Sequence, residues 1–407
     1  MENQQLIPHL FRIEFRKIVA VLVRFFGAHH INAAEDIASD TFVQALETWP
    51  YKGTPSNPQA WLYTVAKRKA LNHIKRQETF DGKIRAELAR PTSTSEIDID
   101  LSEKNILDSQ LQMLFAICHP SIRVESQIAL ALRLLCGFGV DEIANAFLTN
   151  KETISKRLFR AKETLRNENI VVEFPTKAEV ALRLEAVLRT LYLLFSEGYC
   201  SETDDAVIRE DLCIEAMRLT HLLLESPYGD SPGVSALLAL MCFHASRFRA
   251  RKNQSGGLVL YEDQDEHLWD QDLIARGVSY LHEASRGDSV SKYHLEAAIA
   301  WWHTVKNDSG EKWKSILRLY DHLLKIEYSP IAALNRTYAL SKVNGKRHAI
   351  AEAEALRLDN NPYYHALLGE LYHGLDNTIA KHEFERALQL TRTKPNREAI
   401  RKKIDSL

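Results

Sequence analysis

The chain has 407 residues, of which 45% are hydrophobic and 26% charged, and its formal net charge at pH 7 is −2. This length exceeds one ordinary hydrophobic core and predicts two to four domains, while the apolar content excludes wholesale disorder. The longest apolar runs, such as Ile18 to Val23, are far shorter than the roughly 20 residues of a membrane span, so we expect no membrane contact.

The N-terminus and the cysteines together predict a cytoplasmic protein. Residues Met1 to Gln5 include no basic stretch leading into an apolar core, which is the pattern of a signal peptide. The five cysteines are scattered without a CxxC pair, which argues against a disulfide framework or a zinc site. We therefore expect a reducing compartment, no metal and no cofactor.

The spacing of apolar residues predicts an all-α fold. In the first block, over residues 6–78, it predicts helices from Phe11 to Phe26, from Ala33 to Trp49, and from Pro58 to about Gln77, with room for a shorter element before Phe11. Gly27 and Pro50 are expected to end the first two of these helices. Residues 79–104 are polar and acidic and predict a flexible linker, and a second small helical block follows over 105–170.

The remaining residues, 176–407, predict a long helical extension with a repeat near 329–392. Apolar and small residues recur there 34 positions apart, which is the period of the tetratricopeptide helix pair. The matched positions are Ala332 and Ala366, Leu334 and Leu368, Tyr338 and Tyr372, Ile350 and Phe384, Ala353 and Ala387, and Leu356 and Leu390.

Residues 139–158 fit a helix-turn-helix. Ala144 is small where the two helices would cross, and Thr149 or Asn150 can cap the second helix. An ordinary helical hairpin would show the same pattern. The exposed face of the second helix would carry cations and hydrogen-bonding groups suited to a DNA major groove and its phosphates. We expect the contacts to come from Lys151, Thr153, Ser155, Lys156, Arg157 and Arg160.

Two other helices present polar faces. Within 33–49, Asp36, Asp40 and Gln44 lie on one stripe, which is either a solvated face or a docking surface for a basic protein. From Lys67 to Arg76 there are five cations and no acid, and aromatic residues lie nearby. Aromatic residues beside cations suit single-stranded nucleic acid, although Trp61 by itself favours a core role over a stacking platform.

The combination resembles the small extracytoplasmic-function sigma factors of the sigma-70 family. Residues Ala34 to Ala45 look like part of sigma region 2, Pro58 to Asn72 resemble the helix that engages the −10 promoter element, and the helix-turn-helix is similar to region 4, which reads the −35 element. The C-terminal extension resembles a subgroup of these factors with tetratricopeptide-like repeats. The likeness covers nearly the whole chain.

The resemblance implies a set of partners and contacts. Core RNA polymerase would be bound through its β′ clamp and β flap, with Glu35, Asp36, Asp40 and Gln44 on the clamp. The melted −10 strand of promoter DNA would be held by Trp61, Lys67, Arg68 and Asn72. The acidic linker would lie in the RNA path of the polymerase, and the C-terminal extension would regulate activity or bind a protein partner.

Other functions remain open at this point. The chain contains no HExxH, GxSxG or Gly-rich phosphate loop, so we expect no enzyme activity. A helix-turn-helix regulator with a repeat sensor domain would bind duplex DNA without polymerase, and it would have no need of the N-terminal helices. A pure repeat scaffold would need neither basic cluster.

Overall fold

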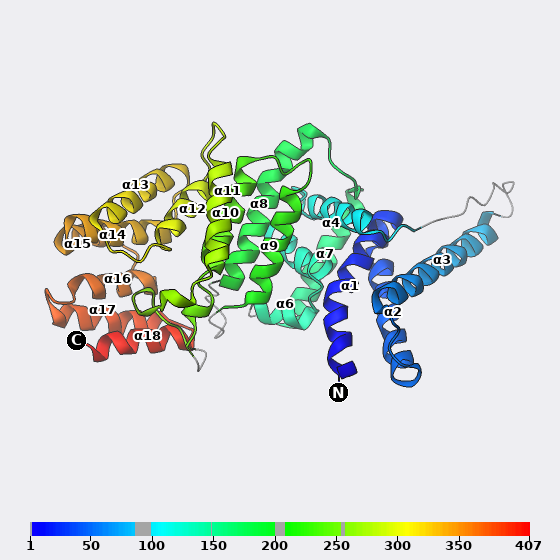
Figure 1. The fold of residues 1–407 in the computed structure, drawn as a ribbon, viewed down its shortest axis with the longest axis horizontal. Helices are drawn as coiled ribbons and strands as arrows, with labels where there is room; N and C mark the ends of the chain where they lie inside the picture. The colour runs from blue at the N-terminus through cyan, green and yellow to red at the C-terminus, as the bar shows by residue number, and fades with distance from the viewer. Residues whose placement is uncertain (1, 86–98, 148, 200–207, 254–256) are drawn as a thin grey trace. The chain divides into compact units, whose positions relative to one another are not determined.

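The computed structural model describes residues 2–85, 99–147, 149–199, 208–253 and 257–407. These residues form helices and no β-strand, which confirms the all-α prediction (Figure 1). Contacts divide the chain into two compact units, Met1–Thr190 and Leu191–Leu407, and helix α8 (Lys177–Tyr199) runs through the boundary. Among the described helices, none is long and apolar enough to cross a membrane.

The N-terminal unit starts with three long helices. They are α1 (Glu2–Phe26), α2 (Ile31–Lys52) and α3 (Pro58–Arg85), with a 3-10 turn η1 (Ala28–His30) between the first two. Shorter elements follow: α4 (Glu103–Ile117), α5 (Val124–Leu130), the π-helical turn η2 (Ala131–Leu135), α6 (Val140–Ala146) and α7 (Lys151–Asn167).

The ends of the first helices follow the sequence only in part. Gly27 ends α1 as predicted, with a φ of +85° that favours glycine. Pro50 does not end α2, because it lies in the last turn, where a missing N–H removes a single helical bond. The helix instead ends at Gly53, whose N–H donates to the Trp49 carbonyl oxygen at 3.0 Å.

Two further boundaries differ from the prediction. One helix, α1, takes the place of a short element followed by a helix from Phe11. Helix α3 continues to Arg85, so the predicted linker begins within a helix, and its residues 86–98 lie outside the described residues. At the other end of the linker, Ser102 caps α4 and accepts a hydrogen bond from the backbone of Asn105.

The core of the N-terminal unit surrounds α1. Ile18 to Val23 are all at most 2% exposed. Because consecutive residues of a helix point in all directions, such a run is buried only where the helix is covered on every side. Helices α2, α3 and α4 and the turn η2 all pack against α1. The two blocks that the sequence places on either side of a linker therefore share one core.

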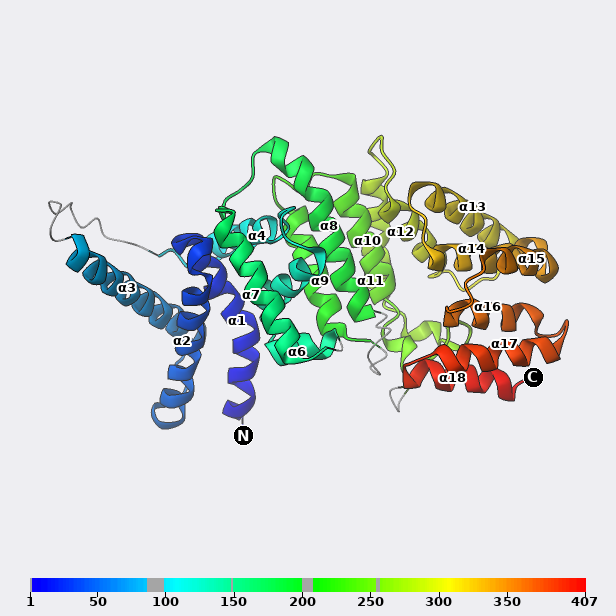
Figure 2. The same cartoon turned by 180° about the vertical axis from the view of Figure 1, so that it is seen from behind.

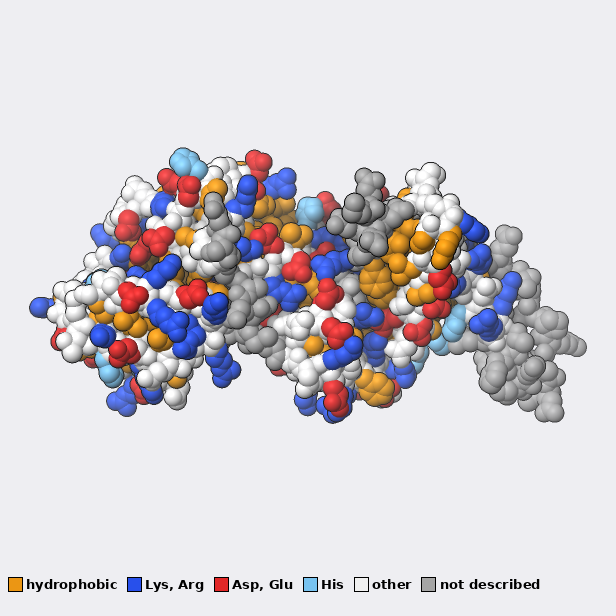
Figure 3. Space-filling model, turned by 90° about the horizontal axis from the view of Figure 1, so that it is seen from below, with side chains coloured by type: hydrophobic (Ala, Val, Ile, Leu, Met, Phe, Trp, Pro, Cys, Tyr) orange, Lys and Arg blue, Asp and Glu red, His pale blue; other side chains and the backbone are white. Residues whose placement is uncertain are grey.

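The C-terminal unit is a succession of packed helices, seen from the other side in Figure 2. After α8 come α9 (Glu210–Leu224), α10 (Pro232–Ala245), the 3-10 turns η3 (Arg249–Arg251), η4 (Tyr261–Asp263) and η5 (Glu266–Leu268), α11 (Gln271–Ala284), α12 (Lys292–Trp302), α13 (Gly310–Ile326), α14 (Pro330–Asn344), α15 (Lys346–Leu356), α16 (Pro362–Tyr372), α17 (Asn377–Leu390) and α18 (Lys394–Asp405). Cationic and acidic side chains are interspersed on the face shown in Figure 3, in keeping with the small net charge.

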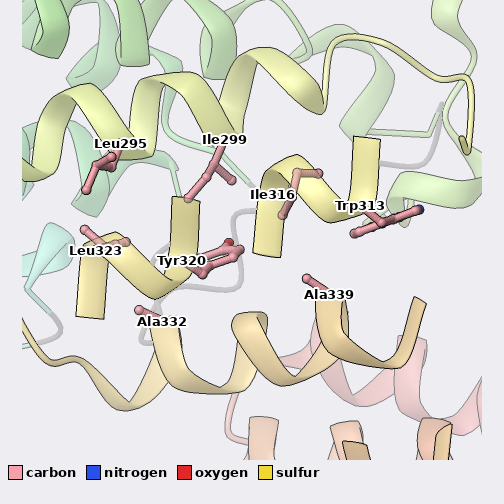
Figure 4. Close-up of a cluster of buried hydrophobic side chains, with 8 residues drawn as sticks. All are labelled: Leu295, Ile299, Trp313, Ile316, Tyr320, Leu323, Ala332 and Ala339. Carbon is pink, nitrogen blue, oxygen red and sulfur yellow. The ribbon is translucent and has the colours of Figure 1, made fainter. Parts of the chain in front are cut away.

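Aromatic and aliphatic side chains of α12, α13 and α14 form one core cluster of this unit. Figure 4 shows Ile316 and Tyr320 of α13 lying between residues of the two neighbouring helices. Beyond it, α14 with α15 and α16 with α17 form successive helix pairs. Two of the matched pairs are buried alike: Leu334 and Leu368 are 4% and 5% exposed, and Ala353 and Ala387 are both fully buried. The assignment of these pairs to a tetratricopeptide-like repeat stays a prediction.

Candidate nucleic-acid interface

Helices α6 and α7 meet through a short turn, and their packed face is apolar. Ile143 and Ile154 are fully buried, and Ala144 is 4% exposed where the helices pack. The Asn150 side chain accepts a hydrogen bond from the Thr153 N–H at 2.7 Å, so it caps α7 as the sequence suggests. The second helix of the expected helix-turn-helix therefore starts at Lys151.

The opposite face of α7 is exposed and positively charged. Lys151, Ser155, Lys156 and Arg160 are exposed, and Thr153 and Arg157 are half-buried. Lys151 and Lys156 form surface ion pairs with Asp141 at 2.9 Å and Glu152 at 2.6 Å. Such exposed pairs contribute little stability, so these lysines can exchange their carboxylates for phosphates.

Arg157 is held differently from the two lysines. Its guanidinium carbon lies 5.7 Å from the centre of the Phe147 ring, and no described carboxylate pairs with it. The contact orients the side chain along the surface of the motif. Arg160 is exposed one turn further along α7. Both are therefore charges that a polyanion could neutralise.

Helices α2 and α3 bring the acidic stripe and the basic helix together. The Lys69 Nζ lies 3.9 Å from the Asp40 carboxylate, and the Arg68 guanidinium lies 3.5 Å from the Gln44 side-chain oxygen. Asp36 is exposed one turn earlier on α2. Residues expected to contact polymerase thus lie directly beside residues expected to contact DNA.

Trp61 packs partly against the core and is partly open to solvent. Its ring meets that of Trp49 edge-on, with 5.4 Å between the centroids, and Trp49 is 2% exposed. Trp61 itself is half-buried, so one part of the ring is in the core and another part reaches the surface. Lys67 is also half-buried, whereas Asn72 is exposed. Tyr51, in the last turn of α2, is 89% exposed.

Glu35 lies in a different environment from the other three residues of the predicted clamp contact. Its side chain is buried, and one carboxylate oxygen accepts a hydrogen bond from Arg133 Nε at 2.7 Å. The other oxygen accepts one from the Lys162 ammonium, which also donates to Asn32 at 3.1 Å. In this conformation Glu35 binds the protein's own cations, so its expected contact with polymerase is revised to a structural role.

These contacts join α2 to two elements that follow the predicted linker. Arg133 belongs to the π-helical turn η2, and Lys162 belongs to α7. The Arg133 guanidinium carbon also lies 5.2 Å from the centre of the Phe15 ring. Sequence reasoning assigned Arg133 no role, although a lone cation within the apolar run 128–135 was the available signal.

A third ion pair joins α1 to α6. Arg12 of α1 contacts the Glu142 carboxylate at 2.6 Å, and its guanidinium carbon lies 4.7 Å from the centre of the Phe138 ring. The other Glu142 oxygen accepts a hydrogen bond from the Gly139 N–H at 2.7 Å, which fixes the start of α6. A side chain at Gly137 would place its Cβ 2.7 Å from the Arg12 carbonyl oxygen, so the backbones approach closely here.

Comparison with known proteins gives the chain a family. It is 33% identical to the "Uncharacterized protein R00370" of Rhizobium meliloti over 402 residues, which cover 96% of this chain and 93% of that protein. The chain belongs to that protein's family. In this chain, residues 10–79 match sigma-70 region 2, and residues 183–285 match a family of unknown function, DUF6596.

Known sigma factors match a shorter part of this chain. The chain is 28% identical to the RNA polymerase sigma-H factor of Pseudomonas aeruginosa over 37% of its own length and 78% of that protein. It is 24% identical to the RNA polymerase sigma factor YlaC of Bacillus subtilis over 41% of this chain and 93% of that protein. No solved structure matches. Together with the region 2 match, these relatives make the N-terminal part of this family member sigma-70-like.

Proposed function

We propose that the chain is a sigma factor that directs core RNA polymerase to specific promoters and assists initiation. One observation carries the proposal: the region 2 match falls on α1–α3, where exposed acidic residues of α2 lie against basic residues of α3. A factor that binds polymerase and melted DNA at once needs both surfaces side by side. No bond is made or broken by the chain itself.

The exposed residues divide between two partners. Asp36, Asp40 and Gln44 bind the β′ clamp of the polymerase through charge complementarity. The face of α7 fixes the factor on duplex DNA at the −35 element, as its cations replace condensed counterions. The region around Trp61, Lys67, Arg68 and Asn72 holds the unpaired −10 strand by stacking and phosphate contacts. The C-terminal unit regulates activity or binds a protein partner.

Reconstitution tests the proposal directly. The purified full chain is added to core RNA polymerase, and transcription is measured from the DNA upstream of its own gene. We expect a discrete transcript that depends on the chain and a stable complex with the core enzyme at low ionic strength. Duplex binding without polymerase binding would contradict the proposal and favour the helix-turn-helix regulator.

Replacing both Arg157 and Arg160 by glutamine is expected to weaken binding to promoter duplex by about tenfold or more. Each lost phosphate contact also lowers the slope of log K against log salt concentration by about 0.9, so the slope should fall by about 2. Both values come from fluorescence anisotropy titrations at several salt concentrations. The control is Lys104→Gln, an exposed cation on α4, and an unchanged slope in the double variant would remove both arginines from the interface.

Reversing the charge at Asp36 is expected to weaken the complex with core polymerase. Asp36 is exposed and has no ion-pair partner among the described residues, so Asp36→Lys changes the surface without breaking an internal contact. We expect a loss of roughly tenfold in affinity, mainly through slower association, measured by biolayer interferometry. Glu125→Lys, an exposed reversal on α5, serves as the control. Equal behaviour of the two variants would exclude Asp36 from the docking surface.

A further inference from the structure

The C-terminal unit contains a cavity of about 720 Å³ that the proposed function does not use. Its volume lies in the range of sites that bind small molecules. Its walls come from the end of α8, from Arg247 and Arg251, from residues 258–264 and 303–308, and from helices α13, α14, α16 and α18. Aromatic side chains line part of it, among them Tyr261, Trp313 and Tyr338.

Positive charge is in excess around this cavity. The lining holds five cations (Arg247, Arg251, Lys306, Lys342 and Lys403) against three acids (Glu262, Asp308 and Glu370), and 5 − 3 leaves +2. All three acids form ion pairs with lysines of the lining. Lys403 lies 3.0 Å from Glu370 and 4.0 Å from Glu262, and Lys342 lies 3.8 Å from Asp308.

The other three lining cations have no carboxylate within 4.0 Å in the described part of the chain. Arg247 donates to the Tyr199 hydroxyl at 3.4 Å, Arg251 donates to the Tyr199 carbonyl oxygen at 3.4 Å, and Lys306 donates to the Gln264 carbonyl oxygen. A fourth cation, Lys312, is 1% exposed and donates to the Tyr261 hydroxyl at 3.1 Å and to the Val305 carbonyl oxygen. The Asp308 carboxylate acts on Lys312, whereas Arg247, Arg251 and Lys306 have only neutral hydrogen-bond partners among the described residues.

Two buried side chains of the lining also have unused polar atoms. Arg247 is 7% exposed, and its Nε has no hydrogen-bond partner. Gln264 is 4% exposed, and its Oε1 has none. A buried polar atom without a partner costs about 1–3 kcal/mol, so such atoms call for a missing acceptor or donor. An anion in the cavity would give Arg247 the acceptor that it lacks.

The neighbouring imidazoles reflect the same positive field. Burial, followed by Arg247 and Lys312, lowers the pKa of His303 to about 3. Burial, followed by Arg247 and Arg251, also holds the pKa of His244 well below its usual value. Both histidines are therefore neutral at pH 7 and leave the arginines as the charged groups of the site.

We propose that this cavity binds a small organic anion, with its carboxylate or phosphate group on Arg247 and Arg251 and its apolar or aromatic body beside Tyr261, Trp313 and Tyr338. Planar guanidinium groups match the oxygens of both kinds of anion. The binding requires neither polymerase nor DNA, so its test is independent of the proposed sigma function.

The test uses the full chain and three aromatic probes at constant ionic strength. Phenyl phosphate and benzoate carry the two oxyanions, and benzamide is the neutral analogue of benzoate. We expect at least one oxyanion to raise the thermal unfolding midpoint and to bind in isothermal titration, and benzamide to do neither. A response to only one of them identifies which oxyanion the cavity prefers.

Arg247→Gln is expected to weaken binding of the responding probe at least tenfold without lowering the midpoint of the unliganded chain, because it removes an unpaired buried cation. Lys306→Gln, at the half-buried wall of the cavity, is a second variant should Arg247→Gln fail to fold. The controls are Lys381→Gln, exposed on α17, and the Arg157 and Arg160 double variant, both of which should respond as the wild type does. No response to either oxyanion, an equal response to benzamide, or full binding by both cavity variants would overturn the proposal.

Discussion

Replacing Glu35 by alanine is expected to lower the free energy of unfolding of the N-terminal unit by about 3–5 kcal/mol, the usual result of breaking a buried ion pair from one side. The carboxylate serves two cations, Arg133 and Lys162, whose side chains are only 18% and 16% exposed. Without Glu35 both charges stay largely desolvated and lose their shared acceptor. Glu35→Gln should cost less, since the amide oxygen can still accept one hydrogen bond.

Hydrogen exchange followed by mass spectrometry localises this effect. Peptides from α2 and α7 should lose protection in Glu35→Ala, whereas peptides from α13 and α14 report the C-terminal unit and should stay unchanged. Asp36→Ala is the matched control, because the neighbouring carboxylate is exposed and should change stability by no more than about 0.5 kcal/mol. Equal protection in both variants would show that the buried pair contributes nothing.

Glu296→Gln is expected to stabilise the C-terminal unit at pH 8 and to have little effect near pH 4.5. Burial raises the pKa of Glu296 to about 7 from 4.5, although the Tyr192 hydroxyl, 3.4 Å away, and Lys292 act in the opposite direction. Between pH 4.5 and pH 7 the native state binds more protons than the unfolded state. The free energy of unfolding therefore falls as the pH rises through this range. Glutamine removes this loss, which amounts to about 3 kcal/mol above pH 7.

Urea unfolding at several pH values measures the difference between wild type and variant. Tryptophan fluorescence is a suitable signal, because four of the six tryptophans (Trp269, Trp301, Trp302 and Trp313) belong to the C-terminal unit. Glu311→Gln, an exposed change at the start of α13, should show no such pH dependence. A constant difference between pH 5 and pH 8 for Glu296→Gln would mean that Glu296 titrates normally.

Local features of the fold were predictable from the sequence where a single residue type decides the conformation. Gly27 ends α1 because a positive φ favours glycine, and Asn150 caps α7 because its side-chain oxygen accepts the Thr153 N–H. The prediction from Pro50 was wrong, because a proline in the last turn of a helix removes a single backbone hydrogen bond and does not end the helix there. The all-α class followed from apolar periodicity, which survives any arrangement of the helices.

The candidate site was predictable as far as exposure on a helix can be inferred. Lys151, Lys156 and Arg160 of α7 and the acids Asp36 and Asp40 are at the surface, as amphipathic spacing suggests. The burial of Glu35 was not predictable, because its partner Arg133 is 98 residues away and no local pattern encodes that pairing. The anion cavity lay beyond reach for the same reason, since its charges come from four or more separate helices and turns.

The burial of Ile18 to Val23 on every side of α1 has a practical consequence for anyone who divides this protein into pieces. A fragment that stops before α4 would contain every residue that matches region 2, yet it would lay bare one flank of Ile18 to Val23 to water. Such a fragment should self-associate on purification. A failure of the fragment to bind DNA or polymerase would then reflect aggregation through its exposed apolar surface, and would say nothing about the affinity of the full chain. A fragment chosen by the region 2 match ends near residue 79, whereas the folding unit extends to Thr190.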